Sequence, residues 1–328
     1  MALFFLGADL GGTKTHVMVA DENGRVAGFG ESGPGNHESV GYDGFQINLQ
    51  KATLAALNMA GLSANSISGS GFGISGYDWP VQRASSMAVI ETLRLSGAVE
   101  LVNDAELGLL AGSPRLWGIA VVSGTGCNCR GWDESKTHFG RVTGGGAAFG
   151  ENAGAAELML RTGRVLGHAW TGRGPATALS EAFCKRYAVN DLGELLEGLV
   201  CHSFEWSAAD APLVFAVARA GDPVAVDLVR WAGRELGEMT CAVIRQLHFE
   251  ALAFDLVQIG SMWEGSPLLT AEMKKLVLAL APGANFIRTH EPPVVGAVLL
   301  GMQAAGIHPT AEIRNTLIRT VATVRQKK

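Results

Sequence analysis

The sequence has little charge, few aromatic side chains and no long hydrophobic run. Charged residues make up 17% of its 328 positions, and 26 lysines and arginines against 31 aspartates and glutamates leave a net charge of −5. This balance argues against a basic surface for nucleic acid. The longest apolar stretch, 294–306, is interrupted by Gln303 and is shorter than the ~20 residues that a membrane span needs. We therefore expect neither nucleic acid nor a membrane as a partner.

The sequence also has no cysteines spaced for a metal site. Its five cysteines are odd in number and scattered, without a CxxC pair and without a histidine at zinc-like spacing. The apolar residues 3–6 are too few for the core of a secretion signal, and no basic residue precedes them. These absences favour a reducing compartment, so we expect a cytoplasmic protein.

Glycine and apolar residues, in contrast, are abundant. The chain has 43 glycines, nearly twice the usual share, without the three-residue period of collagen. With 48% hydrophobic residues it can bury the cores of two domains. We expect an ordered protein with many tight turns or close backbone approaches.

The first third of the chain predicts three antiparallel strands and then alternating helices and strands. Short apolar runs at 3–8, 16–20 and 26–29 are separated by turn residues. A helix is expected over 42–60, because apolar residues recur on one face and Gly61 is placed to end it. This order of elements is typical of an α/β fold.

The same opening recurs after residue 115. An apolar run at 117–122, a Gly-rich turn and a returning run at 127–132 repeat the pattern of residues 6–19. Later residues look mostly helical, apart from a strand at 254–259. The expected domains are 1–115, then 116–309 with helical insertions, with the C-terminal helix 310–328 as a candidate addition to the first domain.

Residues 9–15, DLGGTKT, form the first loop that could carry chemistry. A Walker or Rossmann loop opens a helix, whereas residues 15–20 continue as a strand. What remains is a hairpin turn whose glycines let backbone N–H groups approach an anion, with Thr13 and Thr15 as further donors. Asp9 is placed to hold a hydrated Mg²⁺. The alternative is an ordinary hairpin, in which the glycines supply positive φ.

A second Gly-rich turn, 123–128 with the sequence SGTGCN, opens the second half. Two such turns, one in each half, suggest a two-sided phosphate clamp across an interdomain cleft. A third small turn, 259–261, again follows an apolar strand and could let a nucleoside lie against the backbone. On its own, this third turn is more often a plain strand-to-helix connection.

These motifs resemble those of the sugar kinase, heat-shock protein 70 and actin superfamily. Segments 9–15, 123–126 and 259–263 match its two phosphate motifs and its adenosine motif, in the right order. The segments GNH at 35–37, SGTGCNCR at 123–130 and IGSMWEGSPLL at 259–269 more narrowly resemble the N-acetylglucosamine kinases of its BadF/BadG-type branch. The resemblance implies binding of ATP with Mg²⁺ through the following residues: Gly11, Gly12, Thr13, Lys14, Thr15, Gly124, Thr125, Gly126, Gly260 and Ser261.

Asp104 corresponds to the catalytic aspartate of that family. A sugar hydroxyl that attacks a phosphoryl group needs a carboxylate to orient it and accept its proton. The alternative role is an N-cap of the helix that follows. By the same resemblance, the sugar would be bound by Asn36, His37, Asp104, Cys127, Asn128, Gly144, Gly145, Gly146 and Glu151.

The chain departs from the family in this last segment. The family usually has Gly-Trp-Gly and then Gly-Asp-Glu-Gly-Ser, whereas this chain has glycines at 144–146 and then GENAG at 150–154. A tryptophan is lost, and a contacting aspartate becomes the longer Glu151. Glu151 could instead serve the N-terminus of the following helix. We therefore expect the sugar preference to differ more readily than the chemistry.

The sequence as a whole predicts two ribonuclease-H-like, actin-like ATPase domains with a cleft between them. The resemblance implies an ATP-dependent kinase for the 6-hydroxyl of N-acetylglucosamine, a small-molecule sugar. Glucosamine, glucose and N-acetylmuramate are alternative substrates, and a homodimer is left open. A different class in the same broad family is an ATPase that activates a reductase through a shared iron–sulfur cluster, but Cys127 and Cys129 lie at the expected sugar turn.

Overall fold

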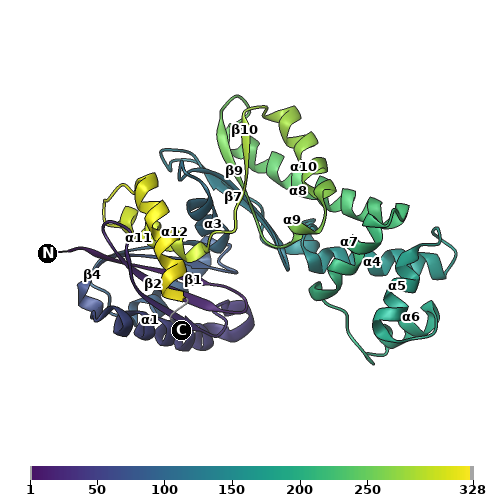
Figure 1. Ribbon diagram of the computed structural model, residues 1–328, viewed down its shortest axis with the longest axis horizontal. Coiled ribbons are helices and arrows are strands. Elements are labelled where there is room, and N and C mark those ends of the chain that lie inside the picture. Colours follow the sequence, from purple (N-terminus) through teal and green to yellow (C-terminus); the bar gives the residue numbers. More distant parts are fainter. Residues whose placement is uncertain (1, 326–328) are drawn as a thin grey trace.

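The computed structural model describes residues 2–325 and shows two domains, each built on a five-stranded mixed sheet (Figure 1). Residues 326–328 of the expected last helix lie outside the described residues. None of the described helices combines the length and the apolar character that a membrane crossing requires.

The first sheet has the strand order β3-β2-β1-β4-β5. Its first three strands form an antiparallel meander, and β4 and β5 join the other side of β1 in parallel. The turn at Gly24, with φ 80°, connects β2 to β3 as the sequence predicted. The bounds are β1 Phe4–Leu10, β2 Thr15–Asp21, β3 Val26–Ser32, β4 Ile67–Ile74 and β5 Ala98–Asn103.

The second sheet repeats this topology with the order β8-β7-β6-β9-β10. Again three strands form an antiparallel meander, and two more join the first strand in parallel. The sequence predicted the β6–β7 hairpin and β9 but missed β8 and β10, because short edge strands carry too few residues for a clear pattern. The bounds are β6 Gly118–Ser123, β7 Cys127–Trp132, β8 Phe139–Arg141, β9 Phe254–Ile259 and β10 Ala284–Arg288.

Helices cover both sheets. The first helix begins five residues before the expected position, since Asn36 caps it and Gly41, with φ 67°, kinks it; it ends at Gly61 as expected. The α-helices are α1 His37–Ala60, α2 Arg83–Glu91, α3 Asp104–Gly112, α4 Ala155–Trp170, α5 Ala178–Tyr187, α6 Leu192–Val200, α7 Ala211–Arg219, α8 Pro223–Leu247, α9 Met262–Gly265, α10 Pro267–Leu280, α11 Pro293–Ala304 and α12 Ala311–Arg325. Short 3₁₀ turns are η1 Ala64–Ser66, η2 Pro80–Gln82, η3 Gly146–Phe149 and η4 Ala208–Asp210.

Helix α11 brings the chain back to the first sheet. In Figure 1 the yellow helices α11 and α12 lie beside the purple strands of the first domain. A Cβ on Gly7 or Gly71 would lie only 2.2–2.8 Å from the α11 backbone or side chain at Ala297, so glycine permits this close crossing. We therefore propose that the first domain comprises 1–115 and 293–325, and thus more of the C-terminal part than the expected helix 310–328.

Helix α3 joins the two domains. It packs against α11 and β4 on one side and against β6, β7 and β9 on the other. Gly108 and Gly112 leave room for Ile259 and Val257 of the second sheet. Residues 105–112 are all buried, so the helix that follows Asp104 is fixed by both domains.

Candidate functional site

Asp104 is the first residue of α3, directly after β5. The N-cap of this helix is Asn103, whose Oδ1 accepts from the backbone N–H of Ala105 at 3.0 Å, so the alternative role of Asp104 as the cap is wrong. Burial raises the pKa of Asp104 to about 6, and the nearby Asp78 adds to the rise while Arg130 opposes it. A carboxyl group with this pKa can exchange a proton near neutral pH.

Asp9 lies near Asp104, at the end of β1. Burial and the negative charge of Asp104 together raise the pKa of Asp9 to about 7. His16 Nδ1 is 3.9 Å from its carboxylate. A buried carboxylate whose proton affinity is raised by a second carboxylate would also be stabilised by a cation. No group of three or more His, Cys, Asp or Glu within 2–325 could hold a metal ion by itself, so Mg²⁺ would need further ligands from water or phosphate.

The turn of residues 11–14 is closed by a hydrogen bond from Gly11 N–H to Lys14 O at 2.9 Å. Gly12 and Thr13 are exposed at its tip. The Lys14 ammonium pairs with Glu31 of β3 at 3.2 Å. Thr15 is fully buried, so its hydroxyl does not lie at the open tip with Thr13.

Three glycines of these turns are not explained by the fold. A Cβ at Gly12, Gly124 or Gly126 would meet no heavy atom of the described chain within 4 Å. None of the three has a positive φ. Neither packing nor backbone conformation therefore requires glycine here, and the open space would let a ligand approach the backbone closely.

The second Gly-rich turn supports a cavity. Its carbonyl oxygens at Gly124 and Thr125 accept the first N–H groups of α4, each at 2.9 Å. Gly260, with φ 102°, packs directly on this turn, where a Cβ would be 2.3 Å from Ser123 O. Beside these two turns lies a cavity of about 570 Å³.

This cavity is lined by Gly124, Thr125 and Ser261, three of the residues that the motifs singled out. Its remaining wall was missed. No sequence signal marked these mostly small or apolar residues, which lie on α4, α7, α9 and the short η4 turn. They are Ala155, Ala208, Ala209, Ala211, Pro212, Phe215, Arg219, Met262, Glu264 and Gly265.

Asn36 and His37 lie where α1 begins. The side chain of Asn36 accepts from Glu38 N–H at 2.8 Å, and Gly76 lies against it. The ring of His37 stacks on Tyr42, with centroids 4.9 Å apart. Its Nδ1 is buried and has no hydrogen-bond partner among the described residues. This ring therefore has a polar atom still to be satisfied.

The side chains of Asn128 and Cys127 point to opposite faces of β7. Asn128 Nδ2 donates to Asn103 Oδ1 at 3.3 Å, and thereby joins the second domain to the segment of Asp104. Neighbours on a strand point to opposite faces, and the sulfur of Cys127 instead accepts from Ala153 N–H at 3.3 Å. Burial raises the pKa of the Cys127 thiol to about 12. Cys127 thus belongs to the packing of the second domain.

Glu151 is almost fully buried and bonds to its own loop. One carboxylate oxygen accepts from the N–H and the hydroxyl of Thr143, both at 2.5 Å, and from Gly144 N–H at 3.2 Å. The other accepts from Gly146 N–H at 3.1 Å. Gly144 and Gly146 have positive φ, which suits glycine. The carboxylate therefore holds the 143–146 loop in shape, and its four donors all come from that loop.

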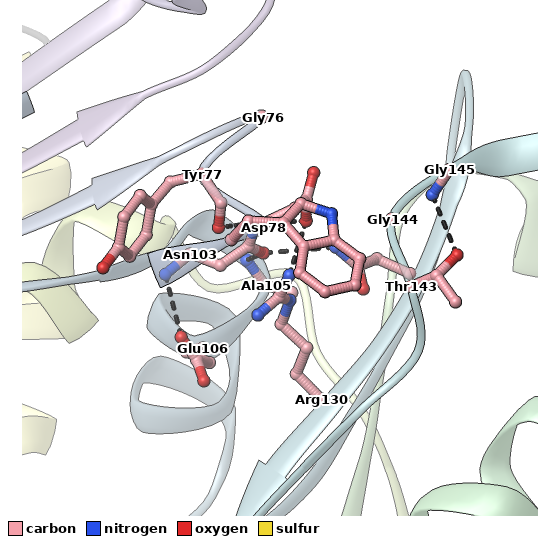
Figure 2. A network of polar contacts seen from close by, with 12 residues as sticks. Gly76, Tyr77, Asp78, Asn103, Ala105, Glu106, Arg130, Thr143, Gly144 and Gly145 are labelled. Atoms are coloured by element: carbon pink, nitrogen blue, oxygen red, sulfur yellow. Dashed lines mark hydrogen bonds and ion pairs between the residues drawn. The ribbon is translucent and has the colours of Figure 1, made fainter. Parts of the chain in front are cut away.

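A polar network that the sequence did not predict surrounds Asp104. Figure 2 shows Asp78 between Asn103 and Arg130. The Asp78 carboxylate accepts from Arg130 Nη2 at 2.5 Å and from Asn103 Nδ2 at 3.3 Å. Asp78 follows β4 of the first sheet and Arg130 lies on β7 of the second. The ion pair thus crosses the domains, and no sequence pattern had marked it.

Comparisons with known proteins agree with this architecture. The sequence is 26% identical over 316 residues to the N-acetyl-D-glucosamine kinase of Dictyostelium discoideum, which covers 92% of this chain and 98% of that protein. It is 25% identical over 300 residues to the N-acetylmuramic acid/N-acetylglucosamine kinase of Clostridium acetobutylicum, covering 90% and 97%.

A proposed N-acetylglucosamine kinase from Chromobacterium violaceum matches in structure with a TM-score of 0.70 and 22% identity, over 91% of this chain and 98% of that one. This match confirms the expected two-domain, actin-like ATPase fold. The profile of the BadF/BadG/BcrA/BcrD ATPase family matches residues 6–301, and the chain therefore belongs to this family.

Proposed function

We propose that this protein is an ATP-dependent sugar kinase that phosphorylates the 6-hydroxyl of N-acetylglucosamine. The observation that carries the proposal is the setting of Asp104. Its carboxyl group has a pKa of about 6 and comes directly after β5. The preceding residue, Asn103, accepts a hydrogen bond from Asn128 of the second domain. A general base between two domains of an ATPase fits transfer to a hydroxyl acceptor.

In this mechanism, Asp104 orients the sugar hydroxyl and accepts its proton as the oxygen attacks the terminal phosphoryl group of ATP. Near pH 7 most of this carboxyl group is ionised, because its pKa is about 6. The proton affinity is still high enough for the carboxylate to take up a proton during transfer. Because an ionised carboxylate only accepts hydrogen bonds, the sugar hydroxyl must donate its proton to Asp104.

The nucleotide is assigned to the two Gly-rich turns and the cavity of about 570 Å³. Open space above Gly12, Gly124 and Gly126 lets their backbone N–H groups approach phosphate oxygens. The apolar wall of the cavity suits a nucleoside. Asp9 would hold Mg²⁺ through water, and the bound ion would offset the charge of the transferring phosphoryl group.

The sugar is assigned to the space beside Asp104, with His37, Asn36 and Asn128 as contacts. His37 Nδ1 and Asn128 Oδ1 are buried without a partner in the described chain, so both can gain from a hydrogen bond to a sugar. Both carboxylate oxygens of Glu151 accept from the glycine loop, so we propose that it acts on the sugar through the shape of this loop. Glucosamine, glucose and N-acetylmuramate remain alternative substrates.

A reductase-activating ATPase is the rival from a different class. Iron–sulfur clusters bind thiolates. Burial raises the pKa of Cys127 to about 12 and that of Cys129 still higher, so both thiols are held protonated in the second domain. This environment favours the kinase. The rival would gain support if the purified protein were coloured and contained iron.

The decisive test is an assay of a sugar panel with ATP and Mg²⁺, reported as kcat/KM, with the product position determined by nuclear magnetic resonance. We expect N-acetylglucosamine to give the highest value and the 6-phosphate as product. A higher value for glucosamine, glucose or N-acetylmuramate would replace the substrate but keep the chemistry. If no sugar in the panel is phosphorylated, the kinase proposal is wrong. The expected cytoplasmic location agrees with this proposal, because ATP is supplied there.

A further inference from the structure

Among residues 2–325, the ion pair between Asp78 and Arg130 is the most buried contact that joins charged side chains of the two domains. The side chains are only 11% and 6% exposed. Burying two charges is costly unless both are well paired, so such a pair is weak as a general stabiliser. Its position beside Asp104 suggests a functional reason instead.

Asp78 contacts three separate parts of the site. It accepts from Asn103, the residue that precedes Asp104 and caps α3. It accepts from Arg130, two residues after Asn128 on β7. It also packs on Gly144 of the glycine loop, where an added Cβ would lie 2.3 Å from the Asp78 carboxyl carbon. One first-domain carboxylate therefore touches the base segment and two second-domain elements.

The backbone of Asp78 is held as firmly as its side chain. Gln82 Oε1 accepts from the N–H groups of Asp78 and Trp79, at 2.8 and 2.7 Å. Gln82 Nε2 lies 3.3 Å from Nε2 of His37. The ring of Trp79 is stacked under the guanidinium of Arg141 at 4.4 Å, which adds a second contact with the second domain. The segment thus reaches from the His37 ring to β7 and β8.

We propose that Asp78 and Arg130 are positioning residues that close the second domain onto the segment of Asp104, so that the base is aligned for transfer only when this pair is made. The proposal rests on the proposed kinase function. Neither residue is assigned contact with the reacting atoms. Asp78 acts through Asn103 on the start of α3, and Arg130 keeps Asp78 in place from the opposite domain.

The test uses Asp78→Asn, Arg130→Met and the double variant, with Arg230→Met as a matched control. Arg230 of α8 pairs with Glu272 of α10 at 3.9 Å, and neither residue lines the nucleotide cavity. We expect each single change to lower kcat about 10- to 100-fold. The kcat of the double variant should be no lower than that of the less active single variant, because the two residues act as one unit. The control should keep the wild-type kcat.

Two further readouts separate positioning from a loss of structure. The Kd for adenosine, measured by calorimetry, should change less than about threefold, since the cavity assigned to the nucleoside is lined by second-domain residues. The acidic limb of the kcat/KM profile should move to lower pH in Asp78→Asn and to higher pH in Arg130→Met. Loss of the Asp78 charge lowers the pKa of Asp104 and loss of Arg130 raises it, while Asp9 and Glu106, the other charges near Asp104, are unchanged. A general weakening of the fold would move both variants the same way.

Small-angle scattering of the nucleotide-free proteins makes the test independent of catalysis. The Asp78 and Arg130 variants should have a larger radius of gyration than the wild type and the Arg230 control. If the wild type phosphorylates sugars but the variants keep more than a third of kcat and the wild-type radius, the positioning role is overturned. If no sugar is phosphorylated while the variants still open, the kinase assignment fails and domain closure by this pair stands. A variant that does not fold is replaced by Arg130→Lys, which keeps the charge but loses the planar guanidinium group. Unchanged kcat and an unchanged radius of gyration in this variant would also overturn the proposal.

Discussion

Glu151 and Thr143 are joined by two hydrogen bonds to a single carboxylate oxygen, one from the Thr143 backbone and one from its hydroxyl. Gly144 and Gly146 complete the set. Four donors of one loop thus hold the carboxylate, three on Oε1 and one on Oε2. A residue that looks like a substrate contact in the sequence is in the folded chain the anchor of the loop.

Glu151→Gln should therefore damage the loop. The amide replaces one acceptor by a donor that faces N–H groups, and a buried charge-assisted bond is lost, at a cost of about 1.5–3 kcal/mol. We expect a lower melting temperature and a loss of kcat/KM by a similar factor for every sugar in the panel. A change confined to one sugar would restore Glu151 as a direct contact. Glu134→Gln, on the β7–β8 turn, serves as a surface control.

Asp104→Asn should keep the fold and lower kcat by ~10²–10⁴, because an amide cannot accept the proton. Sugar affinity, measured by calorimetry without ATP, should change little. Asp227→Asn is the control, since that carboxylate is 75% exposed on α8. A variant that retains more than about a tenth of wild-type kcat would argue against the base assignment.

The pH dependence of kcat/KM should show an acidic limb. Asp104 works in its ionised form, and its folded pKa is raised to about 6. Activity should therefore fall as the pH drops through about 6, and not through the range near 4 that an ordinary aspartate would give. Circular dichroism at each pH verifies that the protein stays folded. A flat profile between pH 7 and pH 5 would contradict this role.

Thr125→Val should raise the KM for ATP about tenfold or more, because a hydrogen bond to a charged phosphate is worth about 1.5–3 kcal/mol. The side chain lines the cavity assigned to nucleotide. Thr13→Val should act in the same direction from the exposed first turn, with sugar affinity unchanged in both variants. Thr125→Ser, which keeps the hydroxyl, is the matched control. A structure with bound nucleotide far from both turns would remove this assignment.

Asp9→Asn should stabilise the metal-free protein at neutral and alkaline pH. The pKa of Asp9 is about 7 in the folded state, against about 3.9 for an ordinary aspartate, so the folded state holds a proton that the unfolded state releases between pH 4 and 7. Its stabilising effect is complete below pH 4 and is lost as the pH rises through about 7. At pH 8 the variant should be more stable by about 2–4 kcal/mol, and the two proteins should converge near pH 4. Thermal unfolding with a chelator measures both; equal stability at pH 8 would contradict the burial of this charge.

The sequence by itself determined the elements whose cause is local. The repeated strand-turn-strand openings follow from alternation and turn residues, and Gly61 ends α1 because only its left-handed backbone fits there. The two Gly-rich turns were found in the same way, and Asp104 followed from the family resemblance that these motifs carry. The match of the family profile to residues 6–301 supports the family that these motifs indicated.

Tertiary structure decided what depends on distant partners. Asp78 meets Arg130 across 52 residues of chain, and Glu151 turns to its own loop because Thr143 and two glycines offer it donors. Helix α11 returns to the first sheet because Gly7 and Gly71 leave room for its backbone. Such contacts depend on how two sheets and α3 pack, and packing is a property of the whole chain that no local pattern encodes.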